Sequence, residues 1–266
     1  METEPALVAR LRAAGCVFAE EEAALLRRAA HTPEELDGMA RRRADGEPLE
    51  QVVGWAEFGD SRIFVDPGVF VPRRRSEFLV SVAVDMAGSR EAAGRPVIVD
   101  LCCGTGALGR AVAAGVGSGE LHAADLDPAA VACARRNVEP GGGRVYQGDL
   151  FDALPSDLRG RIDVLICNAP YVPTAEIAYL PAEAREHEAL MALDGGADGL
   201  AILLRVTASA GEWLAPGGVL LVETSERQAP SMAAAMSAAG LGARIHSDDD
   251  SGATVVTGIG PVGGRG

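Results

Sequence analysis

The sequence predicts an α/β protein built around a mainly parallel sheet of seven strands, preceded by a small helical domain and a β-hairpin. Three observations carry this prediction. Apolar side chains recur at helical spacing over the first fifty residues, and residues 52–71 show extended runs broken by glycine turns. From Arg95 onward, apolar strand-like runs alternate with helical stretches, which is typical of helices covering both faces of a parallel sheet.

The helical domain is predicted over residues 1–50. Leu7, Val8 and Leu11 recur at the spacing of one helical face. The stretch Thr32-Pro33-Glu34-Glu35 predicts the start of a further helix, with Thr32 as cap, proline at the first helical position and an acid three residues after the cap.

Residues 51–75 are predicted to form a β-hairpin linker, because VVGWAEF and RIFVD flank the turn residues Gly59-Asp60-Ser61. The α/β domain then spans residues 76–266. Its predicted strands are 96–101, 121–126, 144–150, 162–168, 217–223, 244–248 and 254–259, and its helical stretches include 111–116, 129–138 and 200–214.

Composition bounds the class of protein. The chain is 48% hydrophobic and 23% charged, and no apolar run approaches the roughly 20 residues of a membrane span, so we expect a soluble protein. The N-terminal stretch lacks a basic segment followed by an apolar one, which predicts a cytoplasmic protein, and we expect a monomer.

Metals and nucleic acids are not expected partners. The five cysteines are odd in number and contain no C-x-x-C pair, and the four histidines are scattered, so neither disulfides nor a metal is predicted. A net charge of −14 disfavours binding to a nucleic-acid backbone without excluding it.

A glycine-rich turn follows the first strand of the α/β domain. Gly104, Gly106 and Gly109 spell G-x-G-x-x-G, which lets backbone amides at a helix start approach a ligand. Asp125 lies about where a ribose-binding acid is expected, roughly 20 residues downstream, and the pattern therefore also fits a nicotinamide dinucleotide.

Two acids favour a different ligand. Asp100, before the glycines, suits a cationic ammonium and would repel a pyrophosphate, and Asp149, after the third strand, suits an adenine amino group. An adenosyl ligand with an amino-acid tail, S-adenosylmethionine, meets all three acids. The remaining predicted cofactor contacts are Cys102, Thr105, Leu126, Leu150 and Asn168.

Some of these residues also have plain structural interpretations. Asp127 precedes Pro128 and is expected to cap the next helix, whereas Asp125 is assigned to the ligand, although it can also serve as a turn residue. Cys102 and Cys103 are expected to pack as small apolar side chains, because no activating base stands beside them.

The loop Asn168-Ala169-Pro170-Tyr171 ends the fourth strand at the edge where ligands gather in open α/β sheets. The side-chain oxygen of Asn168 and the carbonyl of Ala169 are two acceptors at short spacing, and Tyr171 offers a flat wall. Together they can hold a planar NH2 group in line with a sulfonium methyl. The alternative is a simple strand-ending turn.

The chain resembles the release factor glutamine methyltransferase family. The resemblance rests on PLEQVVGWAEFGDSRIFVDPGVFVPRRRSEFLV, DLCCGTGAL, AADLDPAAV, QGDLF, NAPY, HEALMALDGGADGL and LAPGGVLLVETSERQ in order, over nearly the whole chain. It implies a Rossmann-like class I methyltransferase fold. It also implies methylation, from S-adenosylmethionine to give S-adenosylhomocysteine, of the glutamine amide nitrogen in the Gly-Gly-Gln motif of a peptide-chain release factor.

The resemblance further implies roles for single residues. Asn168, Ala169, Pro170 and Tyr171 would form the catalytic loop, and Asp125 would hold the ribose. Phe70, Pro72, Arg73 and Glu77 would bind substrate beside Asn168 and Tyr171, and the helical domain would recognise the protein substrate.

The chain departs from the family pattern at several positions. Ala169 stands where the family loop Asn-Pro-Pro-Tyr has its first proline, Arg74 and Ser76 replace a proline and a threonine of the linker, and Ala189 replaces a proline after Glu188. The arginine usual in the last strand is absent. The departures indicate a divergent member, and they bear on the substrate more than on the reaction.

Four alternatives stay open at this point. The acceptor can be the exocyclic amine of a nucleic-acid base, or a small-molecule amide or amine. The protein can be a nicotinamide-dependent oxidoreductase, or a binding protein that has lost catalysis. The cluster Arg73–Arg75 can be a solvated face or can meet an acidic partner.

Overall fold

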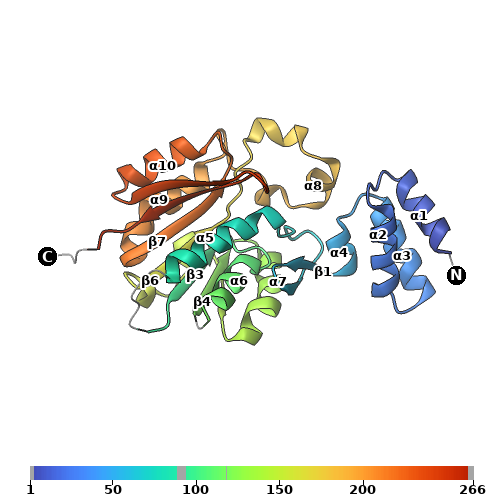
Figure 1. Ribbon diagram of the computed structural model, residues 1–266, viewed down its shortest axis with the longest axis horizontal. Helices are drawn as coiled ribbons and strands as arrows, with labels where there is room; N and C mark the ends of the chain where they lie inside the picture. Colours follow the sequence, from blue (N-terminus) through green and yellow to red (C-terminus); the bar gives the residue numbers. More distant parts are fainter. Residues whose placement is uncertain (1–2, 89–93, 118, 263–266) are drawn as a thin grey trace.

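The computed structural model describes residues 3–88, 94–117 and 119–262. Its N-terminal part consists of helices α1 (Glu4–Ala13), α2 (Ala19–Ala29), α3 (Pro33–Ala44) and the short α4 (Leu49–Val53). Their apolar faces meet in a core of their own that includes Leu7, Leu11 and Leu26, all fully buried. Figure 1 shows these helices as a separate group beside the sheet.

The start of α3 follows the predicted capping pattern, with one difference. The Thr32 hydroxyl accepts a hydrogen bond from the backbone N–H of Glu35 over 3.1 Å. The Glu35 carboxylate accepts from the backbone N–H of His31 over 2.7 Å, one residue before the cap. The acid therefore satisfies the free donor just outside the helix.

The predicted hairpin is present as β1 (Trp55–Phe58) and β2 (Ser61–Phe64), which pair antiparallel with Trp55 opposite Phe64. The buried Asn137 side chain docks this hairpin onto the α/β domain. Its oxygen accepts from the Phe64 N–H over 2.8 Å, and its nitrogen donates to the Phe64 carbonyl over 2.9 Å. The linker is thus fixed to the helix that carries Asn137.

The mainly parallel seven-stranded sheet confirms the predicted fold class. Its order is β5-β4-β3-β6-β7-β9-β8, and only β9 runs antiparallel to its neighbours. The strands are β3 (Val97–Leu101), β4 (Glu120–Asp125), β5 (Arg144–Gln147), β6 (Ile162–Cys167), β7 (Leu214–Thr224), β8 (Gly242–Asp248) and β9 (Ala253–Ile259). The chain order reverses beside β3, and ligands bind at such a switch point, at the carboxyl ends of the strands.

Helices cover both faces of the sheet, because side chains alternate along each strand. Ile98 of β3 packs with α5, α6 and α7, whereas its neighbours Val97 and Val99 pack with α9 and α10 on the opposite face. These helices are α5 (Glu77–Gly88), α6 (Ala107–Gly115), α7 (Pro128–Val138), α9 (Ala201–Trp213) and α10 (Ala229–Ala238). Short 3-10 helices lie at Arg74–Ser76, Glu139–Gly141, Leu150–Ala153, Ser156–Leu158, Thr174–Tyr179 and Leu190–Ala192, and the short α-helix α8 spans Ala182–His187.

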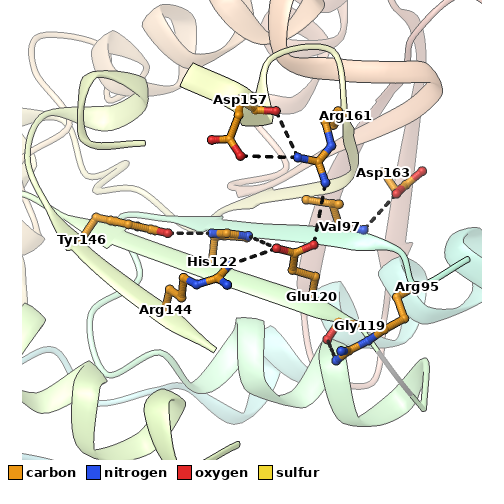
Figure 2. A network of polar contacts seen from close by, with 10 residues as sticks. All are labelled: Arg95, Val97, Gly119, Glu120, His122, Arg144, Tyr146, Asp157, Arg161 and Asp163. Atoms are coloured by element: carbon orange, nitrogen blue, oxygen red, sulfur yellow. Dashed lines mark hydrogen bonds and ion pairs between the residues drawn. The ribbon is translucent and has the colours of Figure 1, made fainter. Parts of the chain in front are cut away.

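A polar network lies at the amino ends of β4 and β5, at the edge opposite the carboxyl ends (Figure 2). The buried His122 ring contacts the Tyr146 hydroxyl over 3.0 Å through Nδ1 and the Glu120 carboxylate over 3.2 Å through Nε2. Arg144 donates to the same carboxylate over 3.0 Å. Burial is the main cause that lowers the pKa of His122, although the Glu120 carboxylate raises it.

None of the helices formed by the described residues combines the length and the apolar character that crossing a membrane requires.

Candidate functional site

A cavity of about 490 Å³ opens at the carboxyl ends of β3 to β6. Most of the predicted site residues line it. They are Phe70, Pro72, Arg73, Cys102, Gly104, Thr105, Asp125, Leu126, Asp149, Leu150, Asn168, Ala169, Pro170 and Tyr171. The fold therefore brings the glycine turn, two of the three acids, the linker and the Asn168 loop to one place.

Asp125 is held between the glycine turn and the next helix. One carboxylate oxygen accepts from the Gly104 N–H over 2.8 Å, and the other accepts from the Asp127 N–H over 2.9 Å. Burial raises the pKa of Asp125, and these backbone N–H groups act against that rise. Asp127 caps α7 as predicted, since its side chain accepts from the Ala129 N–H over 2.9 Å.

Asp100 and two glycines do not line the cavity. The Asp100 carboxylate is buried beneath α6 and accepts from the Gly109 N–H over 2.8 Å. Burial raises its pKa to about 7. A side chain at Gly109 would meet Asp100 at 2.9 Å, and one at Gly106 would meet Val138 at 2.6 Å. Asp100 and Gly109 hold α6 against the sheet, Gly106 packs against α7, and only Gly104 of the glycine pattern faces the cavity.

Asp149 lies at the rim of the cavity and is ion-paired with Arg205 of α9 over 2.7 Å. Next to it, Leu150 adopts a positive φ of 50° and lines the cavity, as does Leu126, whose side chain is largely exposed. A carboxylate beside apolar side chains is a suitable surface for an adenine ring and its amino group. Arg205 was not predicted from the sequence.

Asn168 is oriented by two neighbours. Its side-chain nitrogen donates to the Ser76 hydroxyl over 3.2 Å and to the Glu223 carboxylate over 3.3 Å. Because an ionised carboxylate only accepts hydrogen bonds, the atom that faces Glu223 must be the nitrogen. Among the described residues, none donates to the side-chain oxygen, which is left to accept from a ligand.

Tyr171 belongs to the same network. Its hydroxyl donates to Glu223 over 3.3 Å and accepts from Arg75, whose Nε also lies 3.2 Å from Glu223. Burial is the main cause that raises the pKa of Tyr171 to about 12, so the phenol keeps its proton at neutral pH. Glu223 is thus a buried acid that contacts three side chains of the site.

The back of the Asn168 loop is held by a buried glutamine and a glycine turn. The Gln228 side chain donates to the carbonyls of Tyr171 and Asp198 over 2.9 and 2.8 Å. Gly199, at φ +77, packs so closely that an added Cβ would lie 2.2 Å from the Tyr171 carbonyl. These contacts place the segments 194–200 and 223–228 directly against the back of the Asn168 loop.

The linker forms a second ion pair with a buried acid, in addition to the pair of Arg75 and Glu223. Arg73 is ion-paired with the buried Glu188, and its guanidinium lies 4.8 Å from the centre of the Phe70 ring. Arg75 pairs with Glu223, so two of the three clustered arginines face internal acids, and neither predicted role of this cluster describes them. Glu77 does not line the cavity. It is exposed and accepts from the Gly59 N–H over 3.1 Å, in the hairpin turn.

The cysteines show no sign of nucleophilic activation. A contact with Cys167 and burial hold the pKa of Cys102 well above its usual range, and burial does the same for Cys103. No group of His, Cys, Asp or Glu side chains in the described part of the chain is arranged to hold a metal ion.

Sequence reasoning missed Glu223, Ser76, Arg75, Gln228, Glu188 and Arg205. One signal for Glu223 was available, because it stands near the end of a predicted strand at the same edge as Asp125 and Asp149. Ser76 and Arg75 are more than ninety residues from the Asn168 loop in sequence, and no local pattern connects them to it.

Comparisons with known proteins agree with this geometry. Residues 61–196 match the family model of the methyltransferase small domain. The chain is 39% identical over 220 residues to the release factor glutamine methyltransferase of Streptomyces coelicolor, covering 79% of this chain and 78% of that protein. It is 37% identical over 202 residues to the 4-amino-L-phenylalanine/4-methylamino-L-phenylalanine methyltransferase of Streptomyces pristinaespiralis, covering 75% and 68%.

Solved structures support the fold. A methyltransferase from Pyrococcus furiosus superposes with a TM-score of 0.55 at 16% identity, over 75% of this chain and 88% of that one. The 16S rRNA N2 G1207 methyltransferase of T. thermophilus gives a TM-score of 0.53 at 20% identity, over 77% of this chain and 49% of that one.

The fold and the cavity are those of a class I methyltransferase that uses S-adenosylmethionine. The cavity fits this cofactor, because Gly104 leaves open space on the ligand side and Asp125 and Asp149 offer carboxylates beside the apolar Leu126 and Leu150. With relatives such as that of S. coelicolor matched over most of both chains, the chain belongs to the release factor glutamine methyltransferase family.

Proposed function

We propose that this protein methylates the side-chain amide nitrogen of a glutamine in the Gly-Gly-Gln motif of a peptide-chain release factor. One observation carries the proposal. The Asn168 amide is locked with its nitrogen toward Ser76 and Glu223, so its oxygen is presented as an acceptor. The names of the matched relatives support the choice of glutamine as acceptor.

In this proposal the oxygen of Asn168 and the carbonyl of Ala169 accept the two protons of the substrate NH2 group. Bound S-adenosylmethionine supplies the methyl group and leaves as S-adenosylhomocysteine. Transfer would form a bond between the amide nitrogen and the methyl carbon and would break the bond from that carbon to sulfur, whose electrons stay on sulfur, and the proton lost from the nitrogen would pass to solvent water. The chain lowers the barrier by positioning and by the fixed dipoles of the two acceptors.

The remaining site residues have supporting roles here. Asp125 holds the ribose, Asp149 receives the adenine amino group, and the wall formed by Tyr171, Phe70 and Pro72 shapes the substrate channel. The helical N-terminal part, residues 1–50, recognises the protein substrate, and residues 51–75 link it to the domain of residues 76–266. In this proposal the protein acts in the cytoplasm as a monomer and has no nucleic-acid partner.

The test is mass spectrometry of purified release factor after incubation with the protein and deuterated S-adenosylmethionine. One labelled methyl on the glutamine of the Gly-Gly-Gln motif is expected, and it should be missing when that glutamine is changed to alanine. Asn168→Ala should lose the transfer. Absence of label on the release factor, with cofactor binding intact, would refute the proposal.

A second candidate function is methylation of a small aromatic amine. It is favoured by the 37% identity to the methyltransferase of S. pristinaespiralis, whose named substrates carry an amino group on an aromatic ring. An aryl NH2 group is planar like an amide, so the same two acceptors suit it. Incubation with 4-amino-L-phenylalanine under the same conditions separates the two candidates.

A further inference from the structure

The segment 174–192 leaves the Asn168 loop and exposes large apolar side chains. Tyr179 is 87% exposed, Leu190 62% and Met191 49%. Leu180, Pro181 and Met191 of the same segment line the cavity. An apolar surface that continues out of a ligand cavity marks a site of interaction more often than a scatter of single residues does.

The base of this segment is closed, so its position relative to Asn168 is fixed. The Val172 N–H donates to the Leu193 carbonyl over 3.2 Å, and the Gly195 N–H donates back to the Val172 carbonyl over 2.9 Å. The Thr174 hydroxyl lies 2.7 Å from the Asp194 carboxylate. The exposed apolar residues are therefore carried on a loop that starts and ends beside the predicted catalytic loop.

The same segment approaches the helical N-terminal part. Glu183 of α8 lies 3.9 Å from Arg43 of α3, and Arg43 is itself mostly buried against Glu22 at 2.7 Å. In Figure 1, α8 lies between the N-terminal helices and the sheet. A partner seated on this segment can thus touch both parts of the chain.

The size of the cavity limits what can enter it. Its volume of about 490 Å³ is within the roughly 300–1000 Å³ typical of a pocket for one small ligand, so it does not also hold a stretch of polypeptide. The backbone that carries a methylated glutamine must then lie outside the cavity, against the residues at its mouth.

We propose that residues 174–192 form a docking lip that binds the polypeptide on either side of the methylated glutamine of the protein substrate. Tyr179, Leu190 and Met191 supply apolar contact area along this polypeptide. This inference rests on the proposed function, and it names the surface that would distinguish a protein substrate from a small amine, which would lie within the cavity.

The test compares the wild-type chain with the double variant Tyr179→Ser, Leu190→Ser, since neither residue lines the cavity. Methyl transfer to purified release factor is followed over a range of release-factor concentrations. We expect KM for the release factor to rise roughly tenfold or more, with kcat at saturation and Kd for S-adenosylmethionine unchanged. The matched control is Ile245→Ser, an apolar residue 42% exposed on the outer strand β8, which should leave KM unchanged.

The outcomes separate the two proposals. Transfer by the double variant with the wild-type KM would overturn the docking lip and leave the proposed function standing. Wild-type protein that labels 4-amino-L-phenylalanine and leaves the release factor unlabelled would overturn both. A rise in KM for the double variant alone would support both.

Discussion

The side-chain nitrogen of Asn168 donates a hydrogen bond to the carboxylate of Glu223 over 3.3 Å. The carboxylate is almost fully buried, and Arg75 and Tyr171 are its other partners. Glu223 therefore decides which end of the Asn168 amide faces the cavity, and the orientation of the acceptor depends on a residue that does not belong to the loop.

Glu223→Gln should lower kcat for methyl transfer. Arg75 and the Tyr171 hydroxyl both donate to the other carboxylate oxygen, so in the variant they hold the amide oxygen and the NH2 group faces Asn168, from which it cannot accept. The Asn168 amide then loses its fixed orientation, and a lost hydrogen bond to a charged group corresponds to a fall of roughly ten- to a hundredfold. Single-turnover rates with saturating cofactor measure this. Glu226→Gln, at an exposed position three residues further on, is the control and should keep the wild-type rate. An unchanged rate for Glu223→Gln would remove Glu223 from the positioning of Asn168.

Asp125→Ala and Asp127→Ala should have different effects, although the residues are two positions apart. Both carboxylates line the cavity, but Asp125 is the one assigned to the ribose, so its loss should raise Kd for S-adenosylmethionine by roughly ten- to a hundredfold. Asp127→Ala removes the cap of α7 and should lower the free energy of unfolding by about 1 kcal/mol. Calorimetric titration and urea unfolding measure the two effects. An unchanged Kd for Asp125→Ala would show that Asp125 acts only as a turn residue.

Gly109→Ala should destabilise the protein by about 1–3 kcal/mol, because the new Cβ would meet Asp100 and Leu121 at 2.9 Å. The matched control is Gly211→Ala within α9, where nothing lies within 4 Å of the added atom. That change should raise the free energy of unfolding by about 0.5–1 kcal/mol, as alanine favours helix. Urea unfolding of both variants checks the contrast. Neutral behaviour of Gly109→Ala would contradict the close packing of α6.

The stability of the protein should fall in mild acid through His122. Burial lowers its pKa in the folded state, so below about pH 6.5 the unfolded chain binds a proton that the folded chain does not. The contribution of His122 to the free energy of unfolding therefore decreases as pH drops from about 7.5 to about 5.5, whereas Asp100, whose pKa burial raises to about 7, contributes in the opposite direction. His246, whose pKa burial also lowers, acts in the same direction, and the difference between wild type and His122→Gln isolates His122. Identical pH dependence for the two proteins would contradict this assignment.

Much of the candidate site follows from local patterns. The glycine turn and the acid after β4 are each signalled within about ten residues, and the cavity is lined by Gly104 and Asp125 but not by Asp100, Gly106 or Gly109. For Asp100, proximity to the glycine turn does not show which side of the turn the carboxylate faces. Asp100 points beneath α6, toward the Gly109 N–H. Glu77 also lies outside the cavity lining, since it is at the start of α5 but turns toward the hairpin.

The sequence by itself determined the α/β fold, the edge of the sheet at which ligands collect and the presence of two acceptors in the Asn168 loop. The spacing of apolar residues and the turn residues between them are local patterns, and they indicate which face of each helix and strand is buried in the core. Only the tertiary structure decided which distant residues hold the Asn168 loop. Asn168 bonds to Ser76 and Glu223, which are 92 and 55 residues away along the chain, and Tyr171 bonds to Arg75, which is 96 residues away. Hydrogen bonds depend on position within fractions of an ångström, and that precision arises only when distant segments pack together.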